Sequence, residues 1–200
     1  MFFILSKNMC LEIRNKDTYQ YFGDATFRWV PPTFRYYRLY IISGFNLIIK
    51  LTRLLAYILI PNEAEKTYLE MFQYLKNNFG FEPKLFTMDF NKASSKAIKK
   101  IFPNIYLIKC FFHFIQTIWK HFIRYGLTKK IFNKELFELS FNIKMLCFIE
   151  PDNINKEYKK ILKKYNKKEF DEFYNYFDRT WKPKSKYKNI KYPNLIILKF

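Results

Sequence analysis

Two aspartates, Asp24 and Asp89, have the residue type and the position that divalent-metal chemistry needs. Asp24 follows a glycine in or at the end of an apolar strand, and Asp89 closes a short predicted strand at the point where a helix begins. Ligands of α/β sheets usually bind at such strand ends. Carboxylate oxygens are the ligands that Mg²⁺ prefers, and two metal ions about 3.5–4 Å apart can stabilise the attacking and leaving oxygens of a phosphoryl transfer. The pair therefore predicts a metal site that acts on phosphate esters.

A structural role for the same two residues stays open at this point. Aspartate is common in turns, which suits Asp24 after Gly23. Aspartate is also a preferred N-cap residue, which suits Asp89 before the next helix. Spacing by itself does not separate these roles from metal binding.

The elements around the aspartates predict an α/β fold. The first strand is predicted from Tyr19–Phe22 and its continuation Thr26–Val30, which have strand composition. Residues 36–43 and 47–60 are predicted as the second and third strands, with a turn at residues 44–46. The period then changes to a helix over 64–78 with Asn62 as its cap, a strand over 84–88, a helix over 91–102 and a strand over 105–108. Three antiparallel strands followed by β-α-β make a mixed sheet of ribonuclease-H-like order.

The rest of the chain is predicted to be helical. One helix starts near Phe111 and ends near Gly126, and three more cover residues 136–148, 154–165 and 170–181. This pattern predicts a core over residues 1–127, a helical region over 128–182 and a basic, poorly ordered tail over 183–200.

Composition narrows the class of partner. The formal charge of +19 favours a polyanion, nucleic acid before an anionic membrane surface, although a merely solvated basic surface stays open. The three cysteines are widely spaced, which argues against a disulfide framework. The most apolar stretch, residues 47–61, contains Lys50 and Arg53 and is shorter than the roughly 20 residues of a membrane helix. With no signal-peptide pattern at the N-terminus, we expect an intracellular protein in the cytosol or nucleus, not one embedded in a membrane.

Six motifs, in order and correctly spaced, resemble the Mutator-like (MULE) transposase domain. Each is weak alone, and together they are specific. They are Gly23-Asp24-Ala25-Thr26-Phe27 with Val30-Pro31, Leu59-Ile60-Pro61-Asn62 with Glu65-Lys66-Thr67-Tyr68, Thr87-Met88-Asp89-Phe90-Asn91-Lys92-Ala93, Phe102-Pro103-Asn104, Cys110-Phe111-Phe112-His113-Phe114-Ile115-Gln116, and Gly126-Leu127.

The resemblance implies a cut-and-paste DNA transposase of the ribonuclease-H-like superfamily with a three-acid active site. Asp24 would be the first acid and Asp89 the second, together holding Mg²⁺ or Mn²⁺. The implied partner is DNA, both transposon ends and target, in the nucleus, with a homo-oligomer left open. In-line attack on the scissile phosphate, first by water and then by a 3′-hydroxyl, would be the reaction.

The third acid of the family has no counterpart in its expected context. In the family it is a glutamate after the helical insertion, and the acids after Asp89 here lie in or beside predicted helices. The resemblance therefore implies that residues 128–182 are an incomplete helical insertion region, and we expect a fragment that stops inside or just after the insertion. Three readings stay open: an active strand transferase, an inactive or domesticated relic that at most binds DNA, and an unrelated basic α/β adaptor.

Two further groups of residues have alternative roles. Cys110 and His113 would be the family's Cys-x-x-His pair near the active-site edge, but two ligands fall short of the four of structural zinc, so a packed thiol beside an imidazole is the alternative. A phosphate-facing surface and a solvated helix face are both open for the basic residues after Asp89. The candidates for DNA contact are Lys96, Lys99, Lys100, Lys120 and Arg124.

Overall fold

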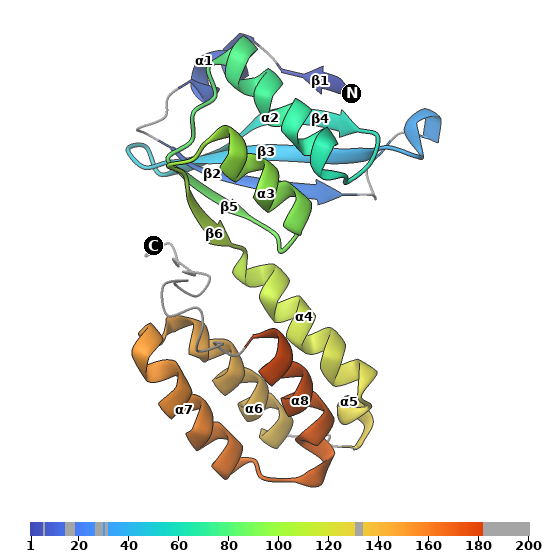
Figure 1. Cartoon of the computed structure of the whole chain (residues 1–200), viewed down its shortest axis with the longest axis vertical. Helices are drawn as coiled ribbons and strands as arrows, with labels where there is room; N and C mark the ends of the chain where they lie inside the picture. Colours follow the sequence, from blue (N-terminus) through green and yellow to red (C-terminus); the bar gives the residue numbers. More distant parts are fainter. Residues whose placement is uncertain (6, 15–18, 27–29, 31, 131–133, 182–200) are drawn as a thin grey trace. The chain divides into compact units, whose positions relative to one another are not determined.

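Six strands form one mixed sheet in the computed structural model, which describes residues 1–5, 7–14, 19–26, 30, 32–130 and 134–181. Their order across the sheet is β1-β4-β3-β2-β5-β6 (Figure 1). The strands are β1 (Phe2–Ile4), β2 (Tyr19–Thr26), β3 (Arg38–Asn46), β4 (Leu51–Ile60), β5 (Leu85–Met88) and β6 (Tyr106–Lys109). Strands β2, β3 and β4 pair antiparallel, while β5 is parallel to β2 and β6 is parallel to β5. The predicted antiparallel meander followed by parallel strands is thereby confirmed.

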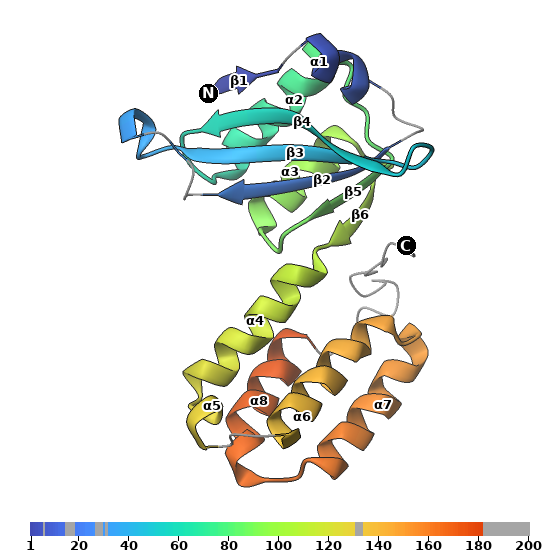
Figure 2. The same ribbon diagram turned by 180° about the vertical axis from the view of Figure 1, so that it is seen from behind.

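Two helices cover one face of this sheet. Helices α2 (Glu65–Phe79) and α3 (Lys92–Ile101) lie over it in Figure 1, and Figure 2 shows the sheet from the other side. Helix α2 buries Tyr68, Phe72 and Leu75, which repeat at helical spacing and so form one apolar stripe. It ends at Gly80, whose left-handed backbone (φ 63°) turns the chain so that the Phe81 N–H donates to the carbonyl of Leu75. The short elements α1 (Lys7–Ile13) and η1 (Pro32–Phe34) complete this part of the chain.

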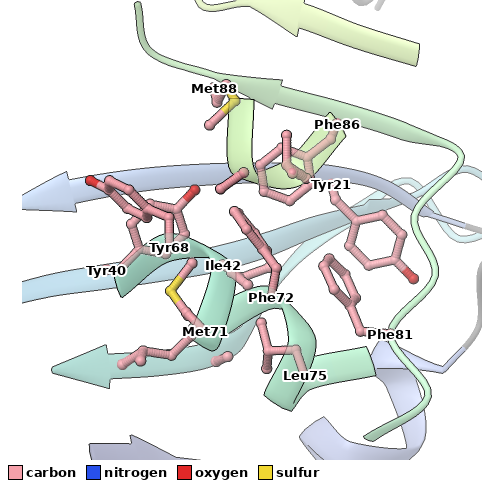
Figure 3. Packing of buried hydrophobic residues seen from close by; sticks show 14 of the residues in the cluster. Tyr21, Tyr40, Ile42, Tyr68, Met71, Phe72, Leu75, Phe81, Phe86 and Met88 are labelled. Carbon is pink, nitrogen blue, oxygen red and sulfur yellow. The ribbon is translucent and has the colours of Figure 1, made fainter. Parts of the chain in front are cut away.

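Aromatic side chains fill the space between the sheet and α2 (Figure 3). Phe72 lies in the middle, with its ring centroid 6.2 Å from that of Tyr40 on β3 and 6.2 Å from that of Phe86 on β5, both nearly edge-on. Tyr40 also contacts Tyr68, at 5.8 Å between ring centroids. These contacts attach α2 to the two strands that flank β2, and therefore to the strand that carries Asp24.

Three local expectations differ from the structure. Residues 44–46 do not form the predicted turn: they continue β3, and the turn falls at residues 47–50. The Asn46 side chain decides this, because its Oδ1 accepts hydrogen bonds from the backbone N–H groups of Ile48 and Ile49. The N-cap of α2 is Ala64 and not Asn62, although Asn62 Oδ1 accepts from the Ala64 N–H just before the helix. Strand β1 and helix α1 were not expected.

The second part of the chain is helical among its described residues. Its elements are α4 (Phe111–Arg124), α5 (Leu127–Lys130), α6 (Lys134–Met145), η2 (Leu146–Phe148), α7 (Pro151–Lys164), η3 (Lys168–Phe170) and α8 (Asp171–Thr180). Phe122 of α4 and Phe173 of α8 are fully buried, 4.5 Å apart between ring centroids. None of the helices that the structure describes is both long and apolar enough to cross a membrane.

The chain divides into two compact units, Met1–Lys109 and Cys110–Phe200. The division falls before α4, whereas the sequence pattern had set the end of the core at residue 127. The predicted basic tail over residues 183–200 lies outside the described residues.

Candidate metal centre

Asp24 lies near the C-terminal end of β2, in the middle of the sheet. Side chains alternate along a strand, so Asp24 projects from one face and Gly23 from the other. Gly23 faces the core: a Cβ placed there would lie 2.3 Å from the Tyr40 hydroxyl oxygen and 2.6 Å from the Phe86 ring. Asp24 therefore projects from the face opposite α2 and α3, and its side chain is exposed.

Asp89 follows β5 by one residue, and the pairing of the strands brings it beside Asp24. Gly23 of β2 is the partner of Met88 of β5 in a parallel register, and each is followed directly by its aspartate. Neighbouring strands lie about 4.8 Å apart. Asp24 and Asp89 thus occupy adjacent positions at the C-terminal ends of two neighbouring strands. Asp89 is half-buried, and its Oδ1 accepts a 3.0 Å hydrogen bond from the backbone N–H of Asn91.

The charges of both carboxylates affect the pKa values of two buried tyrosines. Burial raises the pKa of the Tyr40 hydroxyl far above its usual value, and the charges of Asp89 and Asp24 both raise it further. The Ser94 hydroxyl acts in the opposite direction. The pKa of Tyr68 is raised as well, first by burial and then by neighbouring acids that include the same two aspartates. Both carboxylates therefore lie within electrostatic reach of the same pair of buried phenols.

A lysine that the sequence did not single out holds the turn at Asp89. Lys109, the last residue of β6, is the strand partner of Met88. Its Nζ donates a 2.8 Å hydrogen bond to the main-chain oxygen of Asp89 and another to Ser95 Oγ on α3. Burial lowers the pKa of Lys109 to about 8, against the opposing effect of the Asp89 charge.

The three candidate lysines of α3 divide into two groups. Lys96 and Lys100 form ion pairs with Glu65 at the start of α2, with the Lys96 Nζ 3.9 Å and the Lys100 Nζ 2.5 Å from its carboxylate oxygens. Lys99 is exposed on another side of α3, and its charge is close enough to contribute to lowering the pKa of Lys109. Of the three candidates for phosphate contact on α3, Lys99 is therefore the one whose charge acts on Lys109.

The remaining candidates belong to the second unit. Cys110 is the N-cap residue of α4 and His113 lies in the first turn of that helix. Burial raises the pKa of the Cys110 thiol, but hydrogen bonds from His113 and from backbone N–H groups outweigh it, so the net shift is downward. Lys120 and Arg124 are exposed on α4.

Among the described residues of the first unit, no further acid joins Asp24 and Asp89 in a group of three. Within the described ranges there is no group of three or more His, Cys, Asp or Glu side chains that could hold a metal ion. Five of the later acids lie in or next to helical elements of the second unit: Glu150, Glu169, Asp171, Glu172 and Asp178.

The chemistry of the two aspartates still suits Mg²⁺. Mg²⁺ is usually bound by one or two carboxylates, with waters and substrate phosphates completing the octahedron, so it does not need an all-protein cage. Asp89 satisfies Oδ1 through Asn91, and among the described residues its Oδ2 has no hydrogen bond. One oxygen is thus held by the protein and the other is available as a ligand.

Comparison with known proteins gives a family. Residues 20–117 match the family model of the MULE transposase domain. This segment is similar to a Mutator-like transposase domain. A search of curated proteins found no match. The MULE segment begins in β2 and ends inside α4, so it contains Asp24, Asp89, Lys109, Cys110 and His113.

Proposed function

We propose that this chain is the catalytic-core portion of a Mutator-like DNA transposase, in which Asp24 and Asp89 hold Mg²⁺ or Mn²⁺ against a DNA phosphate. The observation that supports the proposal best is the parallel register of β2 and β5, which sets the two aspartates directly after a pair of partnered residues. The sheet order, a meander with two parallel strands added beside β2, is compatible with a ribonuclease-H-like core. Transposon ends and target DNA in the nucleus are the proposed substrates.

The protein groups around the site have separable tasks. Because Gly23 has no side chain, the Tyr40 and Phe86 side chains can lie close against β2, while the neighbouring Asp24 projects from the other face. The Asn91 N–H orients the Asp89 carboxylate through Oδ1. When bound, the metal ion supplies positive charge against the scissile phosphate. The strong positive charge of the chain favours approach of DNA without reading its sequence.

A DNA-binding experiment tests the proposal. The affinity of a fluorescent duplex is measured with Ca²⁺, which supports binding, and with EDTA, for the wild type, the double variant Asp24→Asn/Asp89→Asn and the control Asp152→Asn. Asp152 is exposed on α7, so it provides the same chemical change elsewhere. We expect Ca²⁺ to strengthen binding several-fold in the wild type and the control but not in the double variant. DNA binding that depends neither on Ca²⁺ nor on the two aspartates would contradict the proposal.

A second candidate is a DNA-binding module that does not cleave. The observation that favours it is the absence of a third acidic ligand among the described residues. Nicking of supercoiled plasmid in Mn²⁺ separates the two candidates. Nicking that disappears in the double variant supports the catalytic role, whereas metal-dependent DNA binding without nicking supports the binding module. A homo-oligomer, which the family resemblance leaves open, is tested by light scattering on the same samples.

A further inference from the structure

The loop that carries Asp89 needs a device to hold it. Strand β5 ends at Met88 and helix α3 begins at Lys92, so the sheet hydrogen bonds stop just before Asp89. A carboxylate in such a connection has the freedom of a loop unless other groups fix the main chain. Metal affinity depends strongly on whether ligands are held in place before the ion arrives.

A closed ring of hydrogen bonds fixes this loop, and Lys109 is the member that comes from outside it. Lys109 Nζ donates to the Asp89 main-chain oxygen at 2.8 Å and also to Ser95 Oγ. Ser95 Oγ in turn donates to the Asn91 main-chain oxygen at 2.6 Å. The Asn91 N–H then returns to the Asp89 carboxylate at 3.0 Å. Without Lys109, only contacts within residues 89–95 would remain in the ring.

The register of the sheet determines that Lys109 acts on the main chain and not on the ion. Lys109 is the partner of Met88, and its side chain reaches Ser95 on α3, so the ammonium group approaches from the helix-covered side. An ammonium group has only hydrogen-bond donors and cannot be a metal ligand. Its place is therefore behind the carboxylate, where it fixes the carbonyl of the same residue.

We propose that Lys109 is a positioning residue of the metal centre: through the Asp89 carbonyl and Ser95 it holds the Asp89 carboxylate in place to bind the divalent ion beside Asp24. This rests on the proposed function, because it assumes that the two aspartates bind a metal. It assigns a task to a residue that makes no contact with the ion.

The sign of the effect distinguishes positioning from simple electrostatics. Removal of a positive charge near two carboxylates should strengthen cation binding, because repulsion between the ammonium group and the ion is lost. Loss of a positioning residue should weaken it, as loss of second-shell partners does, by about 10-fold to 100-fold. The two explanations thus predict changes in opposite directions for the same substitution.

The test is Mn²⁺ binding to the full chain, measured by the electron paramagnetic resonance of free Mn²⁺. The salt concentration is about 0.1 M, at which exposed charges farther apart than the Debye length of about 10 Å are largely screened. We expect Lys109→Met to weaken binding about tenfold, Lys109→Arg to restore most of it, and Ser95→Ala to weaken it by a smaller factor. The matched control is Lys92→Met, which removes an exposed charge at the start of α3 without removing a member of the hydrogen-bonded ring. We expect it to leave binding unchanged or slightly stronger.

Two outcomes would overturn different parts of this account. If wild-type protein binds no Mn²⁺ that depends on Asp24 and Asp89, the proposed function itself fails. If the wild type binds and Lys109→Met binds as tightly or more tightly, only the positioning role fails. Should Lys109→Met not fold, the comparison of Ser95→Ala with the wild type decides: equal Mn²⁺ affinity would then count against the hydrogen-bonded ring.

Discussion

Replacement of Gly23 by alanine tests whether the core beneath the metal centre is as tightly packed as the structure indicates. The added Cβ would lie 2.3 Å from the Tyr40 hydroxyl oxygen and 2.6 Å from the Phe86 ring, and both side chains are buried. Overpacking of a filled core costs about 1–3 kcal/mol, and such short contacts with side chains that cannot retreat point to the upper end. Loss of glycine's backbone freedom offsets about 0.5–1 kcal/mol of this. We therefore expect Gly23→Ala to lower the free energy of unfolding by about 2 kcal/mol.

Urea denaturation followed by far-UV circular dichroism measures this change, and Tyr40→Phe tests its cause. Within the described residues, no hydrogen bond of normal geometry reaches the Tyr40 hydroxyl, although Ser94 lies near enough to influence its pKa. A buried unsatisfied hydroxyl costs about 1–3 kcal/mol, so Tyr40→Phe alone should stabilise the protein by about 1 kcal/mol. It also removes the nearest atom to the new Cβ, so Gly23→Ala should cost about 1 kcal/mol less in the Tyr40→Phe background.

The two results together are diagnostic. A Gly23→Ala variant as stable as the wild type would refute the close approach of Tyr40 and Phe86 to β2. A full cost that persists in the Tyr40→Phe background would attribute the clash to Phe86 alone.

Three further predictions concern groups around the site and in the second unit. Iodoacetamide should alkylate Cys110 at least about 30-fold faster than Cys147 at pH 8, because burial raises the pKa of Cys147 to about 12, whereas the net shift of Cys110 is downward. The fraction of thiolate at pH 8 is more than about 10³-fold higher for Cys110 than for Cys147, and the lower nucleophilicity of the more acidic thiol offsets about 30-fold of this. Equal alkylation rates in peptide mapping would contradict this. Asn91→Ala should lower the free energy of unfolding in urea by about 1 kcal/mol, since Asn91 Oδ1 accepts from the Ser94 N–H as the N-cap of α3, and an unchanged urea midpoint would exclude that role. Glu65→Ala should strengthen DNA binding at low salt, because it releases two lysines of α3 from their ion pairs. Lys99→Ala should weaken DNA binding and make the slope of log affinity against log salt concentration smaller by about 1. Fluorescence anisotropy at several salt concentrations measures both effects, and no response to either substitution would mean that DNA binds elsewhere.

Much of the sheet could be predicted from sequence because its strands and helices have different periods. The change after Ile60 from strand composition to helical spacing marks the passage from the meander to the crossover units. The predicted position of the turn between β3 and β4 was wrong for a physical reason. The apolar residues 47–49 favour a strand and Gly44 favours a turn, but the hydrogen bonds of the Asn46 side chain decide where the chain reverses.

Short elements depend on contacts that sequence does not reveal. Strand β1 has three residues and exists by pairing with β4, and α1 packs against the same strand, where Glu12 and Arg53 form an ion pair. Neither has a local pattern strong enough to predict it, because nucleation of so short a segment needs tertiary support.

The candidate site follows the same division. Asp24 and Asp89 could be selected from residue type and strand position, and their adjacency then required only the parallel pairing of β2 with β5. Lys109 could not be selected, since its role comes from the register that makes it the partner of Met88 and from the position of Ser95 on a separate helix. A lysine at a strand end has no signal of its own in a chain with 36 basic Lys and Arg residues.

The most direct test of the central claim, that Asp24 and Asp89 share one divalent ion, is backbone cleavage by Fe²⁺ with ascorbate and peroxide. Iron in place of Mg²⁺ generates hydroxyl radicals that cut the chain close to where the ion is bound. We predict cuts near residue 24 and near residue 89 in the same samples, both suppressed by excess Mg²⁺ and both lost in either Asp24→Asn or Asp89→Asn. Cuts near only one of the two aspartates, or cuts near one that survive substitution of the other, would contradict a shared metal ion.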